Sequence, residues 1–230
     1  MAEDATVLVL GASRGLGFAL AEEWLGRGRH VIATIRGPAP QIEALQSRYA
    51  GRLHIEAGVD ITDAASVRAL RRRLEGRTLD VLFVNAGICK AAGDTPATVA
   101  EADFLDMMLT NALSPVRAAE VLEDLVAAPG VIAVMTSQIG SITNATGKQQ
   151  CYGASKAALS MLMKCFAERH ADDPRAMLLV APGWVRTDMG GPNATLSIEE
   201  CIPSVADVVE KSAGAPGLRF IDRHGDTLPW

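Results

Sequence analysis

Short apolar runs alternate with longer helical patterns from one end of the chain to the other. Several runs are apolar at nearly every position, as strands covered on both faces of a sheet must be. Seven strands are predicted at residues 6–10, 30–35, 53–57, 79–84, 130–136, 175–180 and 218–221. Helices are predicted at residues 15–28, 41–49, 63–75, 97–127 with a break, 151–170 and 197–212. This alternation predicts the doubly wound α/β class, in which helices cover both faces of one parallel sheet.

No linker, internal repeat or low-complexity tract divides the sequence, so residues 1–230 are expected to form a single domain. The least regular stretch is 183–196, which has three glycines and one proline after a predicted strand. Loops at the carboxyl ends of parallel strands are where ligands bind in this class. We therefore expect 183–196 to be a substrate loop.

Composition narrows the classes of partner. The chain is 49% apolar, enough for a sizeable core, and its net charge of −5 disfavours nucleic acid. The N-terminus is acidic, and no 18 apolar residues run together, so no membrane contact and a cytoplasmic location are expected. The four cysteines and four histidines are scattered, and no metal site is predicted.

A glycine-rich loop follows the first predicted strand and opens a helix: Gly11-Ala12-Ser13-Arg14-Gly15-Leu16-Gly17. Gly11 would allow a tight turn, and Gly15 and Gly17 would let backbone N–H groups approach a pyrophosphate. The alternative is that close packing of helix on strand alone requires the glycines. The position directly after the first strand favours a dinucleotide site.

The end of the second predicted strand bears on which dinucleotide is bound. It reads Thr34-Ile35-Arg36 and offers no carboxylate for a ribose 2′-hydroxyl. Arg36 and Arg14 would form a fork around a 2′-phosphate. This pattern favours NADP(H), with NAD(H) as the second choice, unless both arginines are merely solvated.

Tyr152 and Lys156 are four residues apart near the start of a predicted helix, so their side chains share one face. A tyrosine has a pKa of about 10, and a nearby ammonium group lowers it. Such a pair can exchange a proton with a substrate. The same spacing also occurs by chance, so its weight depends on the other motifs.

Taken together, the motifs resemble the short-chain dehydrogenase/reductase family over essentially the whole chain. They occur in the family's order and spacing: Gly11 to Gly17, Asp60-Ile61, Asn85-Ala86-Gly87, Asn111, Ser137-Gln138-Ile139-Gly140, Tyr152-x-x-x-Lys156 and Pro182-Gly183 through Thr187. Residues 182–192 and the tail 226–230 are similar to the branch of C-factor proteins and sniffer-type carbonyl reductases.

The resemblance implies a seven-stranded sheet in the order 3-2-1-4-5-6-7 and a catalytic tetrad. Tyr152 would donate and accept the proton, Ser137 would polarise the carbonyl oxygen, Lys156 would bind the nicotinamide ribose and lower the Tyr152 pKa, and Asn111 would position a water. The implied cofactor-binding residues are Gly11, Ser13, Arg14, Gly15, Leu16, Gly17, Thr34, Arg36, Asp60, Ile61, Asn85, Ala86, Gly87, Tyr152, Lys156, Pro182, Gly183, Val185 and Thr187.

Two departures from the family pattern stand out. Leu10 replaces the usual threonine before the first glycine, which removes a hydroxyl that supports the turn. The segment from Ser137 to Tyr152 is longer than usual, so Ser141 competes as the catalytic serine. We favour Ser137 because it ends an apolar strand and begins the Ser-x-x-Gly pattern.

The implied function is an NADP(H)-dependent oxidoreductase that interconverts a small carbonyl compound and its secondary alcohol. The alternative is a dinucleotide-binding signalling or regulatory protein with little turnover. A homodimer or homotetramer is also expected, because the helices at 97–127 and 151–170 resemble the family's contact surfaces. Their small and apolar residues include Ala112, Ala118, Ala119, Ala157, Ala158 and Met161, although packing on the sheet would explain these as well.

Overall fold

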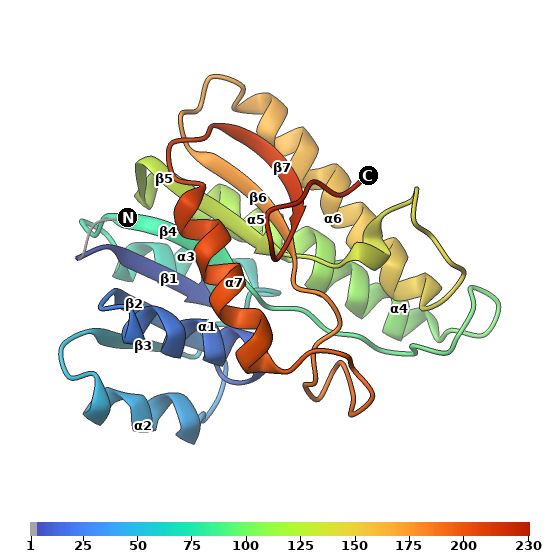
Figure 1. The fold of residues 1–230 in the computed structure, drawn as a ribbon, viewed down its shortest axis with the longest axis horizontal. Coiled ribbons are helices and arrows are strands. Elements are labelled where there is room, and N and C mark those ends of the chain that lie inside the picture. The colour runs from blue at the N-terminus through green and yellow to red at the C-terminus, as the bar shows by residue number, and fades with distance from the viewer. Residues whose placement is uncertain (1–3) are drawn as a thin grey trace.

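A seven-stranded parallel sheet organises the chain in this computed structural model, which describes residues 4–230 (Figure 1). The strands are β1 Thr6–Leu10, β2 His30–Ile35, β3 Leu53–Ala57, β4 Leu79–Val84, β5 Val126–Met135, β6 Ala176–Ala181 and β7 Gly217–Asp222. Their order is β3-β2-β1-β4-β5-β6-β7, and every neighbouring pair is parallel. The predicted fold class and strand order are confirmed.

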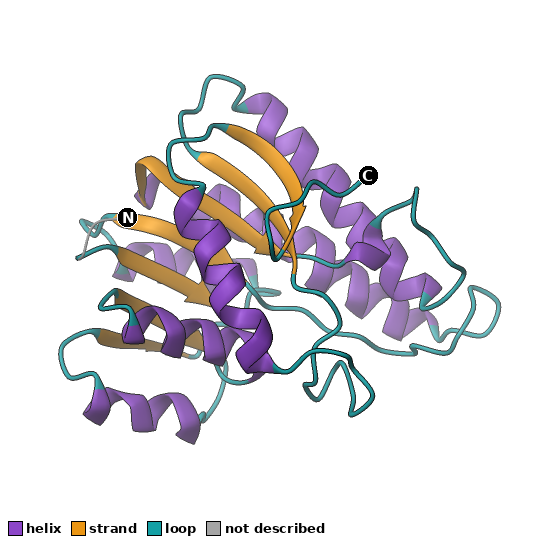
Figure 2. Cartoon of the chain, viewed as in Figure 1, coloured by secondary structure: helices purple, strands orange, loops and turns teal. Residues whose placement is uncertain are grey.

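The helices form layers on both faces of the sheet (Figure 2). They are α1 Gly15–Gly26, α2 Pro40–Arg48, α3 Ala64–Arg73, α4 Glu101–Met108, α5 Ser114–Leu122, α6 Gln150–Arg169 and α7 Ile198–Lys211. Helices α1, α2 and α7 pack on one face, whereas α3, α5 and α6 pack on the other. Alternate residues of β1 therefore enter separate apolar clusters, Val7 and Val9 in one and Leu8 and Leu10 in the other.

The long helix predicted at residues 97–127 is wrong at both ends. Helix α4 begins at Glu101, and α5 stops at Leu122, because Val126 already pairs with Leu79 as the start of β5. Seven other predicted elements run past the structure by one or two residues at an end. Helix ends are the least certain part of a periodicity pattern, since they depend on caps and tertiary pairing.

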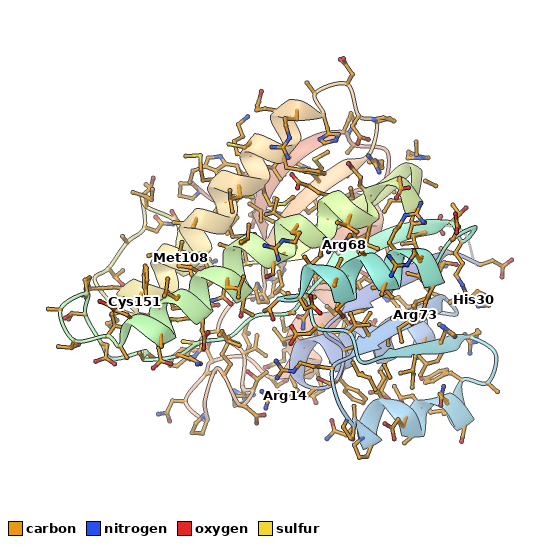
Figure 3. The ribbon with its side chains drawn as sticks, turned by 180° about the vertical axis from the view of Figure 1, so that it is seen from behind. Arg14, His30, Arg68, Arg73, Met108 and Cys151 are labelled. Carbon is orange, nitrogen blue, oxygen red and sulfur yellow. The ribbon has the colours of Figure 1, made fainter. Side chains whose placement is uncertain are left out.

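The predicted break in that long helix is a π-helical turn, Leu109–Leu113, between α4 and α5. Pro115 follows it and cannot donate a hydrogen bond to the carbonyl of Asn111, four residues earlier. A wider turn accommodates the missing bond, and π turns of this kind are frequent at functional sites. Helix α4 then extends beyond the sheet beside α6, as the labelled Met108 and Cys151 show in Figure 3.

Three alanines that the sequence assigned to an intersubunit surface are instead part of the core. Ala112, Ala118 and Ala119 are buried and pack with residues of the sheet and of α3. The packing alternative was therefore correct for them. Met161 of α6, in contrast, is exposed.

Candidate active site

The carboxyl ends of β1, β2 and β4 meet at Gly11. The Gly11 amide donates to Thr34 Oγ1 at 3.0 Å, and the Gly11 carbonyl accepts from Asn85 Nδ2, also at 3.0 Å. Gly11 has a φ of +87°, and a Cβ there would lie 3.0 Å from Ala86 Cβ. Leu10 has no hydroxyl to support the turn. The buried Thr34 hydroxyl supports it instead.

The other two glycines of the loop have different physical reasons. A Cβ on Gly17 would lie 2.1 Å from the Gly11 carbonyl oxygen and 2.5 Å from Asn85 Nδ2, so Gly17 is required for packing of α1. Gly15 has a φ of +57°, and a Cβ there would have no contact closer than 4.0 Å. The packing and ligand interpretations of the loop each account for a different glycine.

The N-terminus of α1 suits an anion. Its N-cap residue, Arg14, makes no side-chain capping bond, and the first turn contains no acidic residue. The amides of this turn point out of the helix end, where the helix dipole favours negative charge. With the open space around Gly15, these features fit the pyrophosphate of a dinucleotide. Ser13 and Leu16 lie half-buried in the same loop.

Both arginines assigned to a 2′-phosphate are exposed, and each is paired with a carboxylate. Arg14 Nη1 donates to Asp188 Oδ2 at 2.9 Å, and Arg36 Nη1 lies 3.7 Å from Asp60 Oδ2. Burial opposes ionisation of Asp60, but hydrogen bonds from Thr62 and the charge of Arg36 outweigh it and lower the pKa of that carboxyl. In Figure 3, Arg14 lies next to the pale red segment that contains residues 183–196.

Asn111, in the π turn, connects the loop after β4 to α6. Its Nδ2 donates to the Ile88 carbonyl at 2.8 Å and to Ser155 Oγ at 3.0 Å, and its Oδ1 accepts from the Ile88 amide. Ser155 Oγ in turn donates to the Tyr152 carbonyl at 2.7 Å. Both N–H bonds of Asn111 are therefore used within the protein, which leaves one Oδ1 lone pair for another donor.

Ser137 and Tyr152 are brought together by two close contacts of the short helical turn η3, Gln138–Gly140, with α6. A Cβ on Gly140 would lie 2.7 Å from Lys156 Cβ, and a Cβ on Gly153 would lie 3.0 Å from the Ile139 carbonyl oxygen. Only glycine fits at either position without displacement. The Ser137 hydroxyl, which caps η3, is then placed where it opposes the rise in the pKa of Tyr152.

Ser141, the competing serine, is engaged elsewhere. It is buried, and its hydroxyl donates to the Trp230 carbonyl at 3.4 Å and accepts from the Asn144 amide at 3.1 Å. These bonds join the chain's C-terminal segment to the loop before α6. The geometry brings Ser137 to the phenol and holds Ser141 in a structural role.

The electrostatics of the Tyr152 and Lys156 pair differ from the sequence expectation. Burial raises the pKa of Tyr152 above its ordinary value, with the neighbouring Cys89 adding to this and the Ser137 hydrogen bond opposing it. Burial lowers the pKa of Lys156 to about 8, and its Nζ donates to the Met135 carbonyl at 3.0 Å. Desolvation dominates both groups, so in the protein by itself the phenol stays protonated.

Residues 183–196 form a folded loop after β6. Val185 and Leu196 make a parallel bridge, and the Trp184 indole donates to the Gly190 carbonyl at 2.8 Å. Gly183 has a φ of +91°, and a Cβ there would lie 2.8 Å from Leu196 Cδ1. The buried Pro182 at the loop's start accepts a hydrogen bond from Cys201.

The remaining predicted residues line the same edge of the sheet. Ile61 is buried beside Asp60, and Thr187 reaches to 4.0 Å from the Cβ position of Gly15. A Cβ on Gly87 would lie 3.3 Å from Asn111 Oδ1 and 3.6 Å from Lys156 Nζ. A ligand that extends from Gly15 to Gly87 would therefore reach Lys156.

Three participants had no signal in the sequence. Ser155 links Asn111 to the Tyr152 carbonyl of α6 by two hydrogen bonds. The Met135 carbonyl accepts from Lys156, and Asp188 pairs with Arg14. Ser155 and Asp188 are ordinary residues in a helix and a loop, and a backbone carbonyl has no residue type. Only the packing of distant segments brings them into the site.

The chain belongs to the short-chain dehydrogenase family, whose model matches residues 5–195. It is similar to a short-chain dehydrogenase/reductase from Burkholderia multivorans solved with bound NADP, with 48% identity, a TM-score of 0.95 and coverage of 99% of this chain and 100% of that one. A carbonyl reductase from Pseudomonas aeruginosa PAO1 in complex with NADP is 37% identical, with a TM-score of 0.91 and coverage of 99% and 100%.

Two further relatives confirm the branch that the sequence indicated. Carbonyl reductase Sniffer of Drosophila melanogaster is 26% identical, with a TM-score of 0.87 and coverage of 99% of this chain and 100% of that one. The C-signal protein of Myxococcus xanthus is 33% identical over 66% of this chain and 93% of its own length.

Residues 4–230 contain neither a helix suited to a membrane nor a cluster suited to a metal ion. None of the helices in this range has the length and apolar character needed to span a bilayer. The same residues contain no group of three or more His, Cys, Asp or Glu side chains placed to hold a metal ion.

The depressed pKa of Lys156 predicts a pH-dependent stability. The folded chain releases this proton near pH 8, whereas the ordinary value is 10.5, so between these values the unfolded state binds more protons and stability rises with pH. Lys156→Met is expected to remove a rise of about 2 kcal/mol between pH 7 and pH 9.5. Urea unfolding of both proteins across this range measures it, and parallel curves would contradict the burial argument.

Proposed function

We propose that the protein is an NADP(H)-dependent oxidoreductase that interconverts a carbonyl compound and its secondary alcohol. The observation that carries the proposal is the protonated Tyr152 phenol, whose pKa Ser137 influences, at the edge of the sheet where the uncapped N-terminus of α1 and the paired arginines also lie. Family membership and the NADP complexes of similar structures support it.

The residues present suit each part of the cofactor. The amides at the start of α1 would bind the pyrophosphate, and Arg14 and Arg36 would bind the 2′-phosphate. Asp60 would accept from the adenine, and Lys156 would donate to the nicotinamide ribose. The bound cofactor would supply or accept the hydride at the carbonyl carbon.

Within this arrangement, the chain's own groups manage the proton. Ser137 would hold and polarise the carbonyl oxygen, and Tyr152 would donate its proton to that oxygen during reduction. Because burial raises the pKa of Tyr152, its phenol is protonated in the protein by itself and has a proton to donate. The Lys156 ammonium, which the Met135 carbonyl holds, would stabilise the phenolate once the proton has left.

We also propose that residues 183–196 close over the substrate. The loop follows β6 on the same edge of the sheet as the phenol, and it exposes two large apolar side chains, Trp184 and Met189. Exposed apolar residues on a ligand-side loop suit contact with an apolar part of a substrate.

Tyr152→Phe is expected to lower carbonyl reduction by at least about 100-fold, because the site loses its proton donor. NADPH oxidation with a panel of ketones, aldehydes and quinones measures this. Tyr49→Phe is the matched control, since Tyr49 stacks with Arg48 and Arg52 at the end of α2, away from the site. Unchanged turnover in Tyr152→Phe would exclude the proposed proton donor.

A signalling protein with little turnover is the second candidate, because the C-signal protein is among the relatives. The same assay separates the two functions. If the wild type binds NADPH but reduces no compound of the panel, the signalling function is favoured. Turnover that depends on Tyr152 favours the enzyme.

Arg36→Asp is expected to lower the preference for NADPH over NADH by about 10- to 100-fold, because it replaces a charge-assisted contact with repulsion. Dissociation constants for both cofactors measure the preference. Arg68→Asp, on the exposed side of α3, is the control for the general change of charge (Figure 3). An unchanged ratio of the NADPH and NADH dissociation constants in Arg36→Asp would show that Arg36 does not contact the 2′-phosphate.

We further propose a homodimer or homotetramer formed through α4, the π turn and α6. Leu105, Leu113, Met161 and Leu162 expose large apolar side chains on these neighbouring elements. Sedimentation is expected to show a multiple of 24.2 kDa, and Met161→Glu is expected to weaken the assembly. Met189→Glu, at a similarly exposed methionine outside this surface, is the control. A monomeric wild type would contradict the assembly.

A further inference from the structure

The loop 183–196 is joined to the N-terminal end of α1 by an ion pair, and its Thr187 lies near Gly15. Asp188 Oδ2 accepts from Arg14 Nη1 at 2.9 Å, and Thr187 Cγ2 lies 4.0 Å from the Cβ position of Gly15. Arg14 is one of the two arginines proposed to bind the cofactor's 2′-phosphate. A carboxylate of the substrate loop is therefore already bound to one of the guanidinium groups of the proposed cofactor site.

The two arginine–carboxylate pairs of this site are not equivalent. Asp60, which faces Arg36 at 3.7 Å, is anchored by the Thr62 amide at 2.9 Å and the Thr62 hydroxyl at 2.7 Å. The Asp188 side chain is 82% exposed, and within residues 4–230 Arg14 is its one side-chain partner. Asp60 is therefore fixed in place, whereas Asp188 is free to leave its arginine.

An exposed ion pair such as Arg14–Asp188 is weak, because water screens it and two side chains must be ordered to form it. A phosphate carries more charge than a carboxylate and offers three acceptor oxygens to the planar guanidinium. A 2′-phosphate would consequently displace the carboxylate, but the binding energy would be reduced by the lost pair and by repulsion from Asp188.

We propose that Asp188 is a cofactor-specificity residue, whose carboxylate competes with the 2′-phosphate of NADP(H) for Arg14. This competition lowers the affinity for NADP(H) and leaves the affinity for NAD(H), which has no 2′-phosphate, unchanged. It also links the cofactor to the loop: a bound 2′-phosphate removes the ion pair between residues 183–196 and α1, whereas a cofactor without it leaves that pair formed. This inference rests on the proposed role of Arg14.

Calorimetric titration with 2′,5′-ADP and 5′-AMP tests the competition without requiring turnover, since the two probes differ by the 2′-phosphate alone. In Asp188→Asn, 2′,5′-ADP is expected to bind about 3- to 10-fold more tightly, and 5′-AMP is expected to bind as in the wild type. Unchanged binding of 2′,5′-ADP overturns the proposal. Weaker binding also overturns it, because Asp188 would then be holding Arg14 in place for the phosphate.

Two controls separate competition from a general effect of charge. Glu22→Gln also removes a carboxylate from an exposed arginine near α1, since Glu22 accepts from Arg48 at 2.9 Å, and it should leave both probes unaffected. In an Arg14→Ala background, Asp188→Asn should no longer tighten 2′,5′-ADP. Equal tightening of both probes, or tightening that persists without Arg14, contradicts direct competition.

The outcome for the wild type distinguishes this inference from the proposed function. A wild type that binds the two probes equally overturns the NADP(H) assignment and the role of Asp188 together. A wild type that prefers 2′,5′-ADP, with no further gain in Asp188→Asn, overturns the role of Asp188 alone.

Discussion

The candidate site depends on backbones that approach one another more closely than a methyl group permits. The Gly11 carbonyl lies only 2.1 Å from where a Cβ on Gly17 would be, and a Cβ on Gly140 of η3 would lie 2.7 Å from Lys156 Cβ of α6. The first contact fixes the start of α1 over the ends of β1 and β4, and the second brings Ser137 to Tyr152. Both halves of the site, the anion end and the proton-transfer end, thus rest on the absence of a side chain at a packing contact.

Dense packing also has an electrostatic consequence. The contacts that assemble the proton-transfer end bury Lys156 and leave Tyr152 half-buried, so desolvation moves both pKa values toward the neutral forms. The Lys156 ammonium donates to the Met135 carbonyl, which fixes its position. A carboxylate in that place would raise the pKa of Lys156, whereas the neutral carbonyl leaves it low. The anion end is different, because Arg14 and Arg36 are exposed and each has a carboxylate beside it.

Periodicity was sufficient for the sheet and much less so for the boundaries. Strands buried on both faces are apolar throughout, and this signal survives without tertiary information. The helix predicted at 97–127 was wrong at its C-terminal end because Val126 and Ala127 are compatible with helix or strand, and pairing of Val126 with β4 makes this segment a strand. The choice between Ser137 and Ser141 was equally beyond a spacing argument, since it depends on what each hydroxyl contacts.

The sequence by itself determined the class of fold, the order of the motifs and the chemical types of side chain at the ligand edge, because those properties are local or periodic. Tertiary structure decided that Gly17 is needed for packing and that Gly15 leaves open space. It also decided that both N–H groups of the Asn111 side chain donate to partners within the protein. It decided as well that burial raises the pKa of Tyr152, and that Asp188 lies against Arg14, 174 residues away. These are properties of distances between segments remote in sequence, and desolvation and ion pairing exist only once the chain has closed around them.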